Sequence, residues 1–382
     1  MPVLDIIYFD AGGGHRAAAT ALKMICERQG RAWDVRLVHL QDILAPVDVF
    51  KKVLRIDLQE IYNQILRRGW TLGSETGLRF MQSVIRLYHD SEVRLMREWW
   101  QFRSQQPPPD LVVSVVPNFN RAILAGLQQA LPGTPYVTIL TDLADFPPAF
   151  WIERQEQDLI VGTAEARRQA LELGHREERV RLTSGMILHP RFYEPLELDR
   201  AAERRALGLD PDLPTGLVLF GGYGTSVMGS ILDRLDRSGL ELQLILIAGR
   251  NEKLRAELGR RPTRLRKHVV GFTAEVPRWM RLSDFFIGKP GPGSLSEAVH
   301  LQLPAITVRN AWTLPQERFN AEWLRQNDLG LVLKSFSGIG GAVRELLAPG
   351  VLERMRGAAA RIRNRAIHEI PEILAGLLER PR

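Results

Sequence analysis

The strongest constraint on the fold is an alternation of short apolar runs with segments of helical period. The runs have the length of buried strands and recur along nearly the whole chain. This alternation is typical of βαβ units, in which successive strands are parallel. Six runs lie in the first half, at residues 4–9, 35–40, 111–116, 136–140, 159–161 and 180–183. Six more lie in the second half, at residues 217–220, 242–248, 269–272, 285–288, 305–308 and 331–334.

Two complete sets of parallel strands are too many for one comfortable sheet, so the sequence predicts an α/β protein with two doubly wound domains. The proline-containing stretch 189–214 marks the boundary between them. We therefore expect an N-terminal domain at 1–195, a C-terminal domain at 196–350, and terminal helices at 351–382 that pack across either domain. Residues 46–106 interrupt the rhythm as a helical insertion.

Composition excludes several classes of protein. Of the 382 residues, 45% are hydrophobic and 25% charged, as in an average soluble globular protein. No apolar run approaches the roughly 18 residues needed to span a bilayer. No basic stretch precedes the first strand as in a secretory signal, and the single Cys26 leaves no intrachain disulfide. These features favour the cytoplasm.

Charge and aromatic residues point to an anionic partner. The net charge of +7 suits nucleic acid, a membrane face or a phosphorylated ligand. Residues 51–103 carry ten basic and six acidic side chains, interleaved with aromatic residues. That mixture is typical of helices at a membrane interface, although ordinary packing on the sheet explains it equally well. The Trp99-Trp100 pair is the feature least typical of a core.

A glycine-rich turn follows the first strand, where Gly12, Gly13 and Gly14 precede a helix expected from about Arg16. Consecutive glycines let the backbone approach a ligand closely at a helix N-terminus. The spacing is not that of a dinucleotide site. His15, at the expected loop tip, is a candidate general base. The alternative is a histidine that only caps the helix.

A second glycine turn follows the first strand of the second half, and a Pro/Gly turn there carries the strongest signal. The second glycine turn comprises Gly221, Gly222, Gly224 and Thr225. The Pro/Gly turn, residues 288–297, contains Lys289 and Gly291 before a helix. Amides of Gly293, Ser294 and Leu295 at that helix start predict a diphosphate site. Ser294 and Glu297 also have capping-box spacing, which is a purely structural alternative.

Polar side chains follow the strand expected at residues 305–308, at Gln316, Glu317 and Asn320. Amides and carboxylates in this position suit sugar hydroxyls, which need both donors and acceptors. The alternative is an ordinary polar helix start.

Together these motifs resemble a known family. Residues 12–18, Gly-Gly-Gly-His-Arg-Ala-Ala, are similar to the N-terminal motif of monogalactosyldiacylglycerol synthases and bacterial processive diacylglycerol glycosyltransferases. Residues 288–297 and 315–320 resemble their donor-site motif, and residues 141–143 also match the family. A more distant resemblance is to the enzyme that adds N-acetylglucosamine to lipid I. The resemblance extends over nearly the full length.

The resemblance implies a GT-B fold, with two Rossmann-like domains facing across a cleft and the last helix crossing back onto the first domain. It implies inverting transfer of a hexose from a UDP-sugar to a diacylglycerol-like lipid hydroxyl. The implied partners are the UDP-sugar, the lipid acceptor and an anionic membrane surface, without nucleic acid. The implied location is the inner face of the plasma membrane, as a peripheral protein.

The resemblance also assigns roles to individual residues. His15 becomes the candidate base, with Asp142 as a second candidate or its support. Gly293 and Ser294 meet the diphosphate, Glu297 the ribose, and Gln316 with Glu317 the hexose. Phe272, Thr273 and Val276 flank the uracil, and the loop 221–225 closes over the phosphates. A helix dipole and Lys289 can stabilise the departing UDP, so the sequence is expected to need neither a metal nor a cofactor.

Two departures from the family concern the acceptor side. Val116-Pro117-Asn118 stands where the family has a His-Pro step, and residues 145–148, Asp-Phe-Pro-Pro, replace a polar stretch that contains histidine. Three alternatives therefore stay open: a UDP-sugar epimerase of the same fold, a glycosyltransferase with a non-lipid acceptor, and a non-catalytic nucleotide-sugar sensor.

Overall fold

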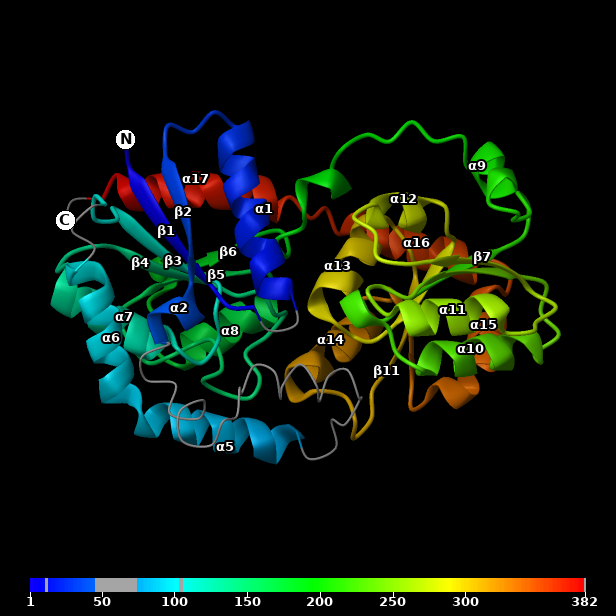
Figure 1. Cartoon of the computed structure of the whole chain (residues 1–382), viewed down its shortest axis with the longest axis horizontal. Helices are drawn as coiled ribbons and strands as arrows, with labels where there is room; N and C mark the ends of the chain where they lie inside the picture. The colour runs from blue at the N-terminus through cyan, green and yellow to red at the C-terminus, as the bar shows by residue number, and fades with distance from the viewer. Residues whose placement is uncertain (11–12, 45–73, 103–105, 381–382) are drawn as a thin grey trace. The chain divides into compact units, whose positions relative to one another are not determined.

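The computed structural model of the chain describes residues 1–10, 13–44, 74–102 and 106–380 (Figure 1). It contains two six-stranded sheets, and every strand pair is parallel. Each of the twelve predicted apolar runs forms a strand, within a few residues of its expected limits. The predicted α/β class with two Rossmann-like domains is therefore confirmed. Each sheet belongs to one of two compact units.

Unit 1 comprises the described residues up to 190 together with residues 364–380. Its strands are ordered β2-β1-β3-β4-β5-β6. They are β1 (Val3–Tyr8), β2 (Asp34–His39), β3 (Leu111–Ser114), β4 (Tyr136–Ile139), β5 (Asp158–Val161) and β6 (Val180–Leu182). Its helices are α1 (Gly14–Arg28), α2 (Leu40–Leu44), α5 (Ser74–Leu87), α6 (His89–Gln101), α7 (Asn120–Ala130), α8 (Ala164–Glu172) and α17 (Ala366–Leu378).

The core of unit 1 forms because side chains alternate between the two faces of each strand. Ile7 and Val112 meet Met96 of α6 and Ile123 of α7 in one buried cluster. Leu4 and neighbouring residues that point to the other face are also fully buried. The C-terminal helix α17 packs against α1, and it buries six of its own residues (Figure 1).

The described residues of unit 2 are 191–363, and its strands are ordered β12-β11-β10-β7-β8-β9. They are β7 (Thr215–Leu219), β8 (Gln243–Ile247), β9 (Arg266–Val270), β10 (Phe285–Gly288), β11 (Ala305–Val308) and β12 (Gly330–Leu333). Its helices are α9 (Arg200–Ala206), α10 (Val227–Asp236), α11 (Glu252–Arg260), α12 (Val276–Arg281), α13 (Pro292–His300), α14 (Pro315–Gln326), α15 (Ile339–Leu346) and α16 (Val351–Arg361).

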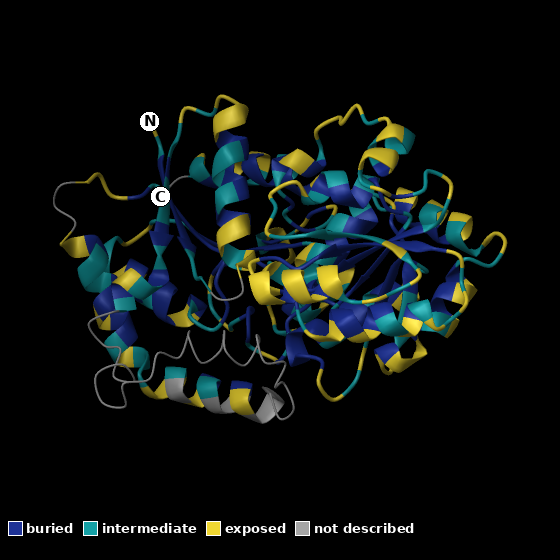
Figure 2. Ribbon diagram, turned by 45° about the vertical axis from the view of Figure 1, so that its right-hand side comes forward, coloured by how far each residue is buried: buried dark blue, intermediate teal, exposed yellow. Residues whose placement is uncertain are grey.

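The sheet of unit 2 is more uniformly buried than its helices. In Figure 2 its central strands have the dark blue of buried residues, while the helices carry exposed surface on their outer sides. Strands β7 and β8 are buried at every position, as expected for parallel strands covered on both faces. Because all strands are parallel, their carboxyl ends share one edge, and ligands of such sheets bind there.

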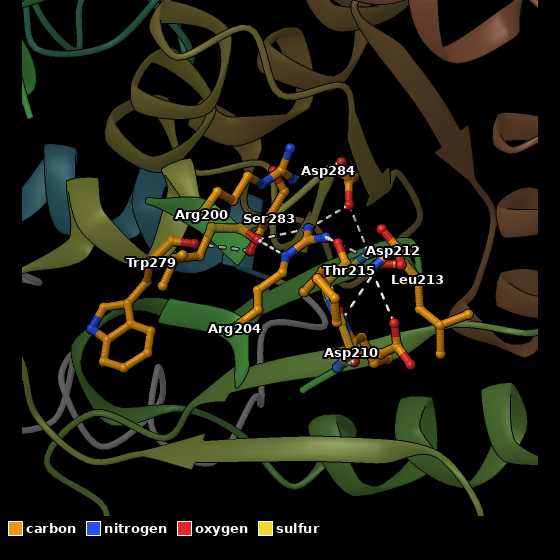
Figure 3. A network of polar contacts seen from close by, with 12 residues as sticks. Arg200, Arg204, Asp210, Asp212, Leu213, Thr215, Trp279, Ser283 and Asp284 are labelled. Atoms are coloured by element: carbon orange, nitrogen blue, oxygen red, sulfur yellow. Dashed lines mark hydrogen bonds and ion pairs between the residues drawn. The ribbon is translucent and has the colours of Figure 1, made fainter. Parts of the chain in front are cut away.

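A charged cluster ties the other end of this sheet together (Figure 3). Asp284 directly precedes β10, and its carboxylate accepts hydrogen bonds from Arg200 and Arg204 of α9 at 2.7 Å each. Arg356 of α16 donates to the same carboxylate at 3.0 Å, and the Thr215 amide donates at 2.8 Å. The cluster therefore joins α9, α16 and the starts of two strands through one aspartate, whose side chain is 14% exposed.

The Trp99-Trp100 pair is a correction to the sequence analysis. Trp100 is 7% exposed, and its Nε1 donates to Asp5 Oδ2 at 3.3 Å. Trp99 packs against the same buried cluster. Both belong to α6, whose apolar side also supplies Met96 to the core. These two tryptophans therefore pack on the sheet, as in an ordinary core. Residues 45–73 and 103–105 of the predicted insertion lie outside the described residues.

Candidate functional site

The first glycine loop of unit 2 is built for close backbone contact at the end of β7. Gly221 has φ 70° and Gly224 has φ 55°, which is left-handed backbone that glycine adopts without strain. A Cβ on Gly224 would lie 2.8 Å from the Ala248 carbonyl oxygen. Gly222 is exposed, and Thr225 Oγ1 accepts from the Val227 amide at 3.0 Å at the start of α10. The predicted loop therefore lies at the carboxyl edge of the sheet.

The Pro/Gly turn after β10 places a helix N-terminus at the same edge. The N-cap of α13 is Gly291, and Pro292 is the first helical residue. The Leu295 amide bonds to the Gly291 carbonyl at 3.1 Å. Leu295 therefore leaves the predicted anion site, and only the amides of Gly293 and Ser294 precede the first intrahelical bond. These two amides and the helix dipole remain suited to an anion.

The start of α13 also overturns the capping-box alternative. A capping box needs the serine at the N-cap, whereas Ser294 is the third helical residue. Glu297 consequently lies in the second turn, not the first. Burial raises the pKa of Glu297 to about 7. A carboxyl group with a pKa in this range beside an anion site is typical of functional sites.

Lys289 links the two loops. Its Nζ lies 2.5 Å from Glu317 Oε1 at the start of α14. Its Cε lies 3.9 Å from the position of a Cβ on Gly221 and 3.5 Å from that of a Cβ on Gly291. The ammonium-bearing side chain thus reaches both glycine loops and the carboxylate. The structure therefore brings together the residues that the sequence predicted for phosphate and hexose.

The remaining residues of the predicted hexose site are buried. Gln316 is 7% exposed, and Asn320 has no exposed surface. The Asn320 side-chain amide donates to the Pro290 carbonyl oxygen at 2.8 Å. Asn320 therefore supports the Pro/Gly turn from behind, a different position from the substrate contact that the sequence predicted.

A third part of the edge carries an aromatic platform after β9. Phe272 is 58% exposed, and the guanidinium of Arg250 lies over its ring, 4.4 Å from the centroid. The Arg250 amide donates to the Gly222 carbonyl at 2.8 Å, so Arg250 joins this platform to the first glycine loop. Thr273 Oγ1 accepts from the Glu275 amide at 2.9 Å, and Val276 begins α12.

Arg250 was missed by the sequence analysis, although a signal for it exists. It follows the strand run 242–248 by one glycine, as the other glycine loops follow their strands. A charged residue at that point of a parallel strand belongs to the ligand-binding edge.

In unit 1, His15 lies in a helix and not at a loop tip. The N-cap of α1 is Gly13, with φ 83°, so the helix starts at Gly14 and makes His15 its second residue. Gly13 and Gly14 are exposed, whereas Gly12 lies outside the described residues. His15 is half-buried, and its Nδ1 lies 3.0 Å from Thr141 Oγ1. The correction is in position only, because the ring remains at the carboxyl edge of β1.

Burial keeps the His15 ring neutral. It lowers the pKa of His15 to about 4, and a hydrogen bond with the Val115 backbone opposes this shift only in part. A neutral imidazole carries a lone pair on one of its two ring nitrogens, and the tautomer sets which one. His15 therefore has the charge state that a proton acceptor needs.

Asp142 supports the same site through Trp151. Asp142 is 6% exposed, and its Oδ2 accepts from Trp151 Nε1 at 2.8 Å. The fully buried Trp151 ring lies 5.7 Å from the His15 ring, centroid to centroid. Of the two roles predicted for Asp142, this arrangement favours support over that of a second base. Trp151 itself carries no local sequence signal that would have identified it.

The turn that carries Trp151 is held from two sides. Asp145 accepts from the Trp151 amide at 2.6 Å and the Ala149 amide at 3.1 Å, and burial raises the pKa of Asp145 to about 6. Gln82 of α5 donates to Asn118 Oδ1 at 3.3 Å and to the Ala149 carbonyl at 3.4 Å. The two residues that Gln82 joins both have positive φ, at 68° and 59°, which is strained for non-glycine residues.

The chain contains one Asp-x-Asp sequence, Asp210-Pro211-Asp212, whose carboxylates have the spacing of a metal-ligand pair. It precedes β7, whereas the donor loops follow strand ends, and the Asp212 amide bonds to Asp210 Oδ1 at 3.0 Å. Throughout the part of the chain that the structure describes, no cluster of three or more His, Cys, Asp or Glu side chains is arranged to hold a metal ion.

No helix among the described residues is both long and apolar enough to span a bilayer. The described part of the insertion does expose apolar side chains: Leu87 at the end of α5 is 78% exposed, and Phe102 after α6 is 76% exposed.

The fold and these sites define the class of protein, a glycosyltransferase of the GT-B fold. Among solved structures, MurG of Acinetobacter baumannii has a TM-score of 0.58 and 14% identity, covering 98% of this chain and all of that one. HepE of Anabaena in complex with UDP-glucose has a TM-score of 0.53 and 15% identity, covering 97% of this chain and 99% of that one.

The sequence is also related to the monogalactosyldiacylglycerol synthases, as the motifs indicated. A probable chloroplastic monogalactosyldiacylglycerol synthase 2 of Oryza sativa subsp. indica is 29% identical over 356 residues, covering 86% of this chain and 70% of that protein. No protein-family model matches the chain. The resemblance inferred from the glycine loops and the donor motif is therefore confirmed.

Proposed function

We propose that the protein is an inverting glycosyltransferase that moves a hexose from a UDP-sugar to the hydroxyl of a diacylglycerol-like lipid at a membrane surface. The observation that carries this proposal is the position of Lys289, which reaches both glycine loops and Glu317. One cation beside two glycine loops and a helix N-terminus suits a diphosphate, and the adjacent carboxylate suits a sugar.

The name of the rice relative supports the acceptor, since a monogalactosyldiacylglycerol synthase is named for a galactose joined to diacylglycerol. The HepE complex supports the donor, because that protein of similar fold binds UDP-glucose.

The proposed chemistry assigns each step of the transfer to particular residues. His15 accepts the proton of the lipid hydroxyl, and the hydroxyl oxygen forms a bond to the anomeric carbon. The bond from that carbon to the diphosphate oxygen breaks on the opposite face, and UDP leaves with the electron pair. Lys289 and the amides of Gly293 and Ser294 stabilise the charge on the leaving diphosphate. Attack opposite the leaving group inverts the anomeric configuration, and no step requires a metal or cofactor.

The membrane part of the proposal rests on surface features of unit 1. Leu87 and Phe102 expose apolar side chains, and the surrounding insertion carries more basic than acidic residues. Apolar side chains with excess basic charge suit the surface of an anionic bilayer. The inner face of the plasma membrane, expected from the sequence, stays a prediction.

Measurement of UDP release tests the proposal. The protein is incubated with UDP-galactose, UDP-glucose or UDP-N-acetylglucosamine, and with vesicles that contain or lack diacylglycerol and anionic lipid. We expect one donor to give UDP release that requires diacylglycerol and increases with anionic lipid. NMR of the glycolipid is expected to show the anomeric configuration opposite to that of the donor. UDP release that ignores diacylglycerol for every donor would contradict the lipid acceptor.

Glu297 gives the proposal a pH signature. Its pKa is about 7 in the free site. Ribose hydroxyls donate to the ionised carboxylate, so donor binding should lower this pKa. We therefore expect the affinity for UDP-hexose to increase as the pH rises through about 7, by at most about tenfold per pH unit. Calorimetry between pH 6 and pH 8 measures this dependence, and Glu297→Gln should flatten it. An affinity that falls with pH would place the carboxylate against the phosphates and not on the ribose.

A further inference from the structure

Two residues that the proposed function assigns to different parts of the donor are bonded to each other in the free site. Lys289 is the cation for the diphosphate, and Glu317 is the acceptor for the hexose. Nζ of Lys289 lies 2.5 Å from Glu317 Oε1. The Glu317 side chain is 8% exposed, whereas that of Lys289 is 39% exposed. The ammonium is therefore the accessible partner of an ion pair whose carboxylate is buried.

Because of this geometry, any ligand that binds the Lys289 ammonium has to break the ion pair, and this costs free energy. A buried carboxylate that loses its cation keeps its desolvation penalty, so breaking such a pair from one side is expensive. When a phosphate oxygen pairs with the Lys289 ammonium, the Glu317 carboxylate becomes such a buried carboxylate without a cation. The cost is removed only if another donor reaches Glu317 at the same time. A hexose hydroxyl is a donor of the right kind, because a carboxylate accepts O–H hydrogen bonds strongly.

The scaffold around the pair keeps both partners in place for this exchange. Lys289 begins the Pro/Gly turn, and the Asn320 amide holds that turn at the Pro290 carbonyl, 2.8 Å away. Glu317 lies in the first turn of α14, whose N-terminal positive dipole end favours the carboxylate. Neither of these supports involves the bond between Lys289 and Glu317, so the two side chains can exchange partners while both supports stay in place.

We propose that Lys289 and Glu317 exchange each other for groups of the UDP-hexose when it binds. This partner exchange couples recognition of the diphosphate to recognition of the hexose. This inference rests on the proposed function. An intact UDP-hexose satisfies both residues, the phosphate pairing with Lys289 and a sugar hydroxyl with Glu317. UDP alone satisfies Lys289 and leaves Glu317 without a donor. After the hexose has been transferred, the ion pair re-forms, competes with UDP for Lys289, and favours release of the product.

The test is a calorimetric comparison of UDP, UDP-galactose and UDP-glucose on the full chain. Glu317→Gln removes the charge that competes for Lys289 and keeps the shape of the side chain. We expect this variant to bind UDP about tenfold more tightly than the wild type. We expect it to bind the UDP-hexoses no more tightly than the wild type, so that its preference for UDP-hexose over UDP falls.

A double-mutant cycle separates the ion pair from other effects of the substitution. Lys289→Met is expected to weaken UDP binding, and adding Glu317→Gln to it should then change UDP affinity by less than about twofold. The matched control is Glu322→Gln. It removes another carboxylate of α14, the one that pairs with Arg325. This control should leave the affinity for UDP unchanged, and unfolding curves of all variants establish that they are folded.

The outcomes distinguish this inference from the function on which it rests. If Glu317→Gln leaves UDP affinity unchanged or lowers it while the wild type binds UDP, the partner exchange is wrong and the donor site stands. If the gain in UDP affinity persists in the Lys289→Met background, the pair is not its source. If the wild type binds neither UDP nor any UDP-hexose, the proposed function fails as well.

Discussion

Replacement of His15 by alanine is expected to lower kcat by about 10²- to 10⁴-fold, which is the usual contribution of a general base. The reason is that the lipid hydroxyl then has to lose its proton to water. The affinity for UDP-hexose should stay within about twofold of the wild type, because the donor residues belong to unit 2 and His15 belongs to unit 1. Initial rates of UDP release, together with calorimetry of the donor, measure the two quantities.

The pH dependence of the wild type follows from the same residue. A base acts in its unprotonated form, and the pKa of His15 is lowered to about 4. The rate attributable to this group should therefore be constant above about pH 5 and fall below about pH 4. A histidine with an ordinary pKa would lose activity already near pH 6.5.

A matched control excludes a general effect of removing a histidine. His175 is also a half-buried histidine of unit 1, its pKa is also lowered by burial, and its Nε2 contacts the Glu153 carbonyl at 2.9 Å. His175→Ala should leave kcat within about threefold of the wild type. If His15→Ala retains most of the activity, or if both variants lose it equally, His15 is not the base.

The second large effect is expected from Asp284→Ala, which should destabilise unit 2 by about 3–5 kcal/mol. Burial alone would raise the pKa of Asp284, but Arg200, Thr215 and Arg204 outweigh it and hold this pKa below its usual range. Removing the carboxylate leaves three guanidinium groups around one point. Arg204 is only 3% exposed, so it cannot regain full hydration.

Urea unfolding followed by circular dichroism measures this loss. The matched control is Asp233→Ala, which breaks an ion pair with Arg261 whose partners are 33% and 29% exposed. An exposed pair contributes about 0–1 kcal/mol, so this variant should unfold close to the wild-type midpoint. If the two variants lose the same free energy of unfolding, the lower exposure of the Asp284 cluster makes no additional contribution to stability.

The strands and the donor loops were predictable because their signals are local. An apolar run of four to six residues next to a glycine turn indicates both a buried strand and its carboxyl edge. Parallel pairing then brings the glycine loop after β7 and the Pro/Gly turn after β10 to one edge, because these two strands are neighbours. The site in unit 2 could therefore be largely assembled from the sequence.

What the sequence did not reveal depends on contacts between distant segments. The sequence around Trp100 does not indicate that its indole donates to Asp5, 95 residues away. The position of Trp151 between Asp142 and His15 depends in the same way on the packing of unit 1. Helix starts were also misplaced, because Gly13 and Gly291 act as N-caps without the side-chain oxygen that usually marks such a position.

The division of the chain between the units has a consequence for the order of folding during synthesis. Unit 1 takes its last helix, α17, from residues that follow the whole of unit 2. Ile367, Ile370 and Leu374 of that helix are buried, and the helix packs against α1 near the opposite end of the sequence. On the ribosome, therefore, the second unit has its complete sequence first, and one apolar face of α1 in the first unit stays uncovered until residues 366–378 are added.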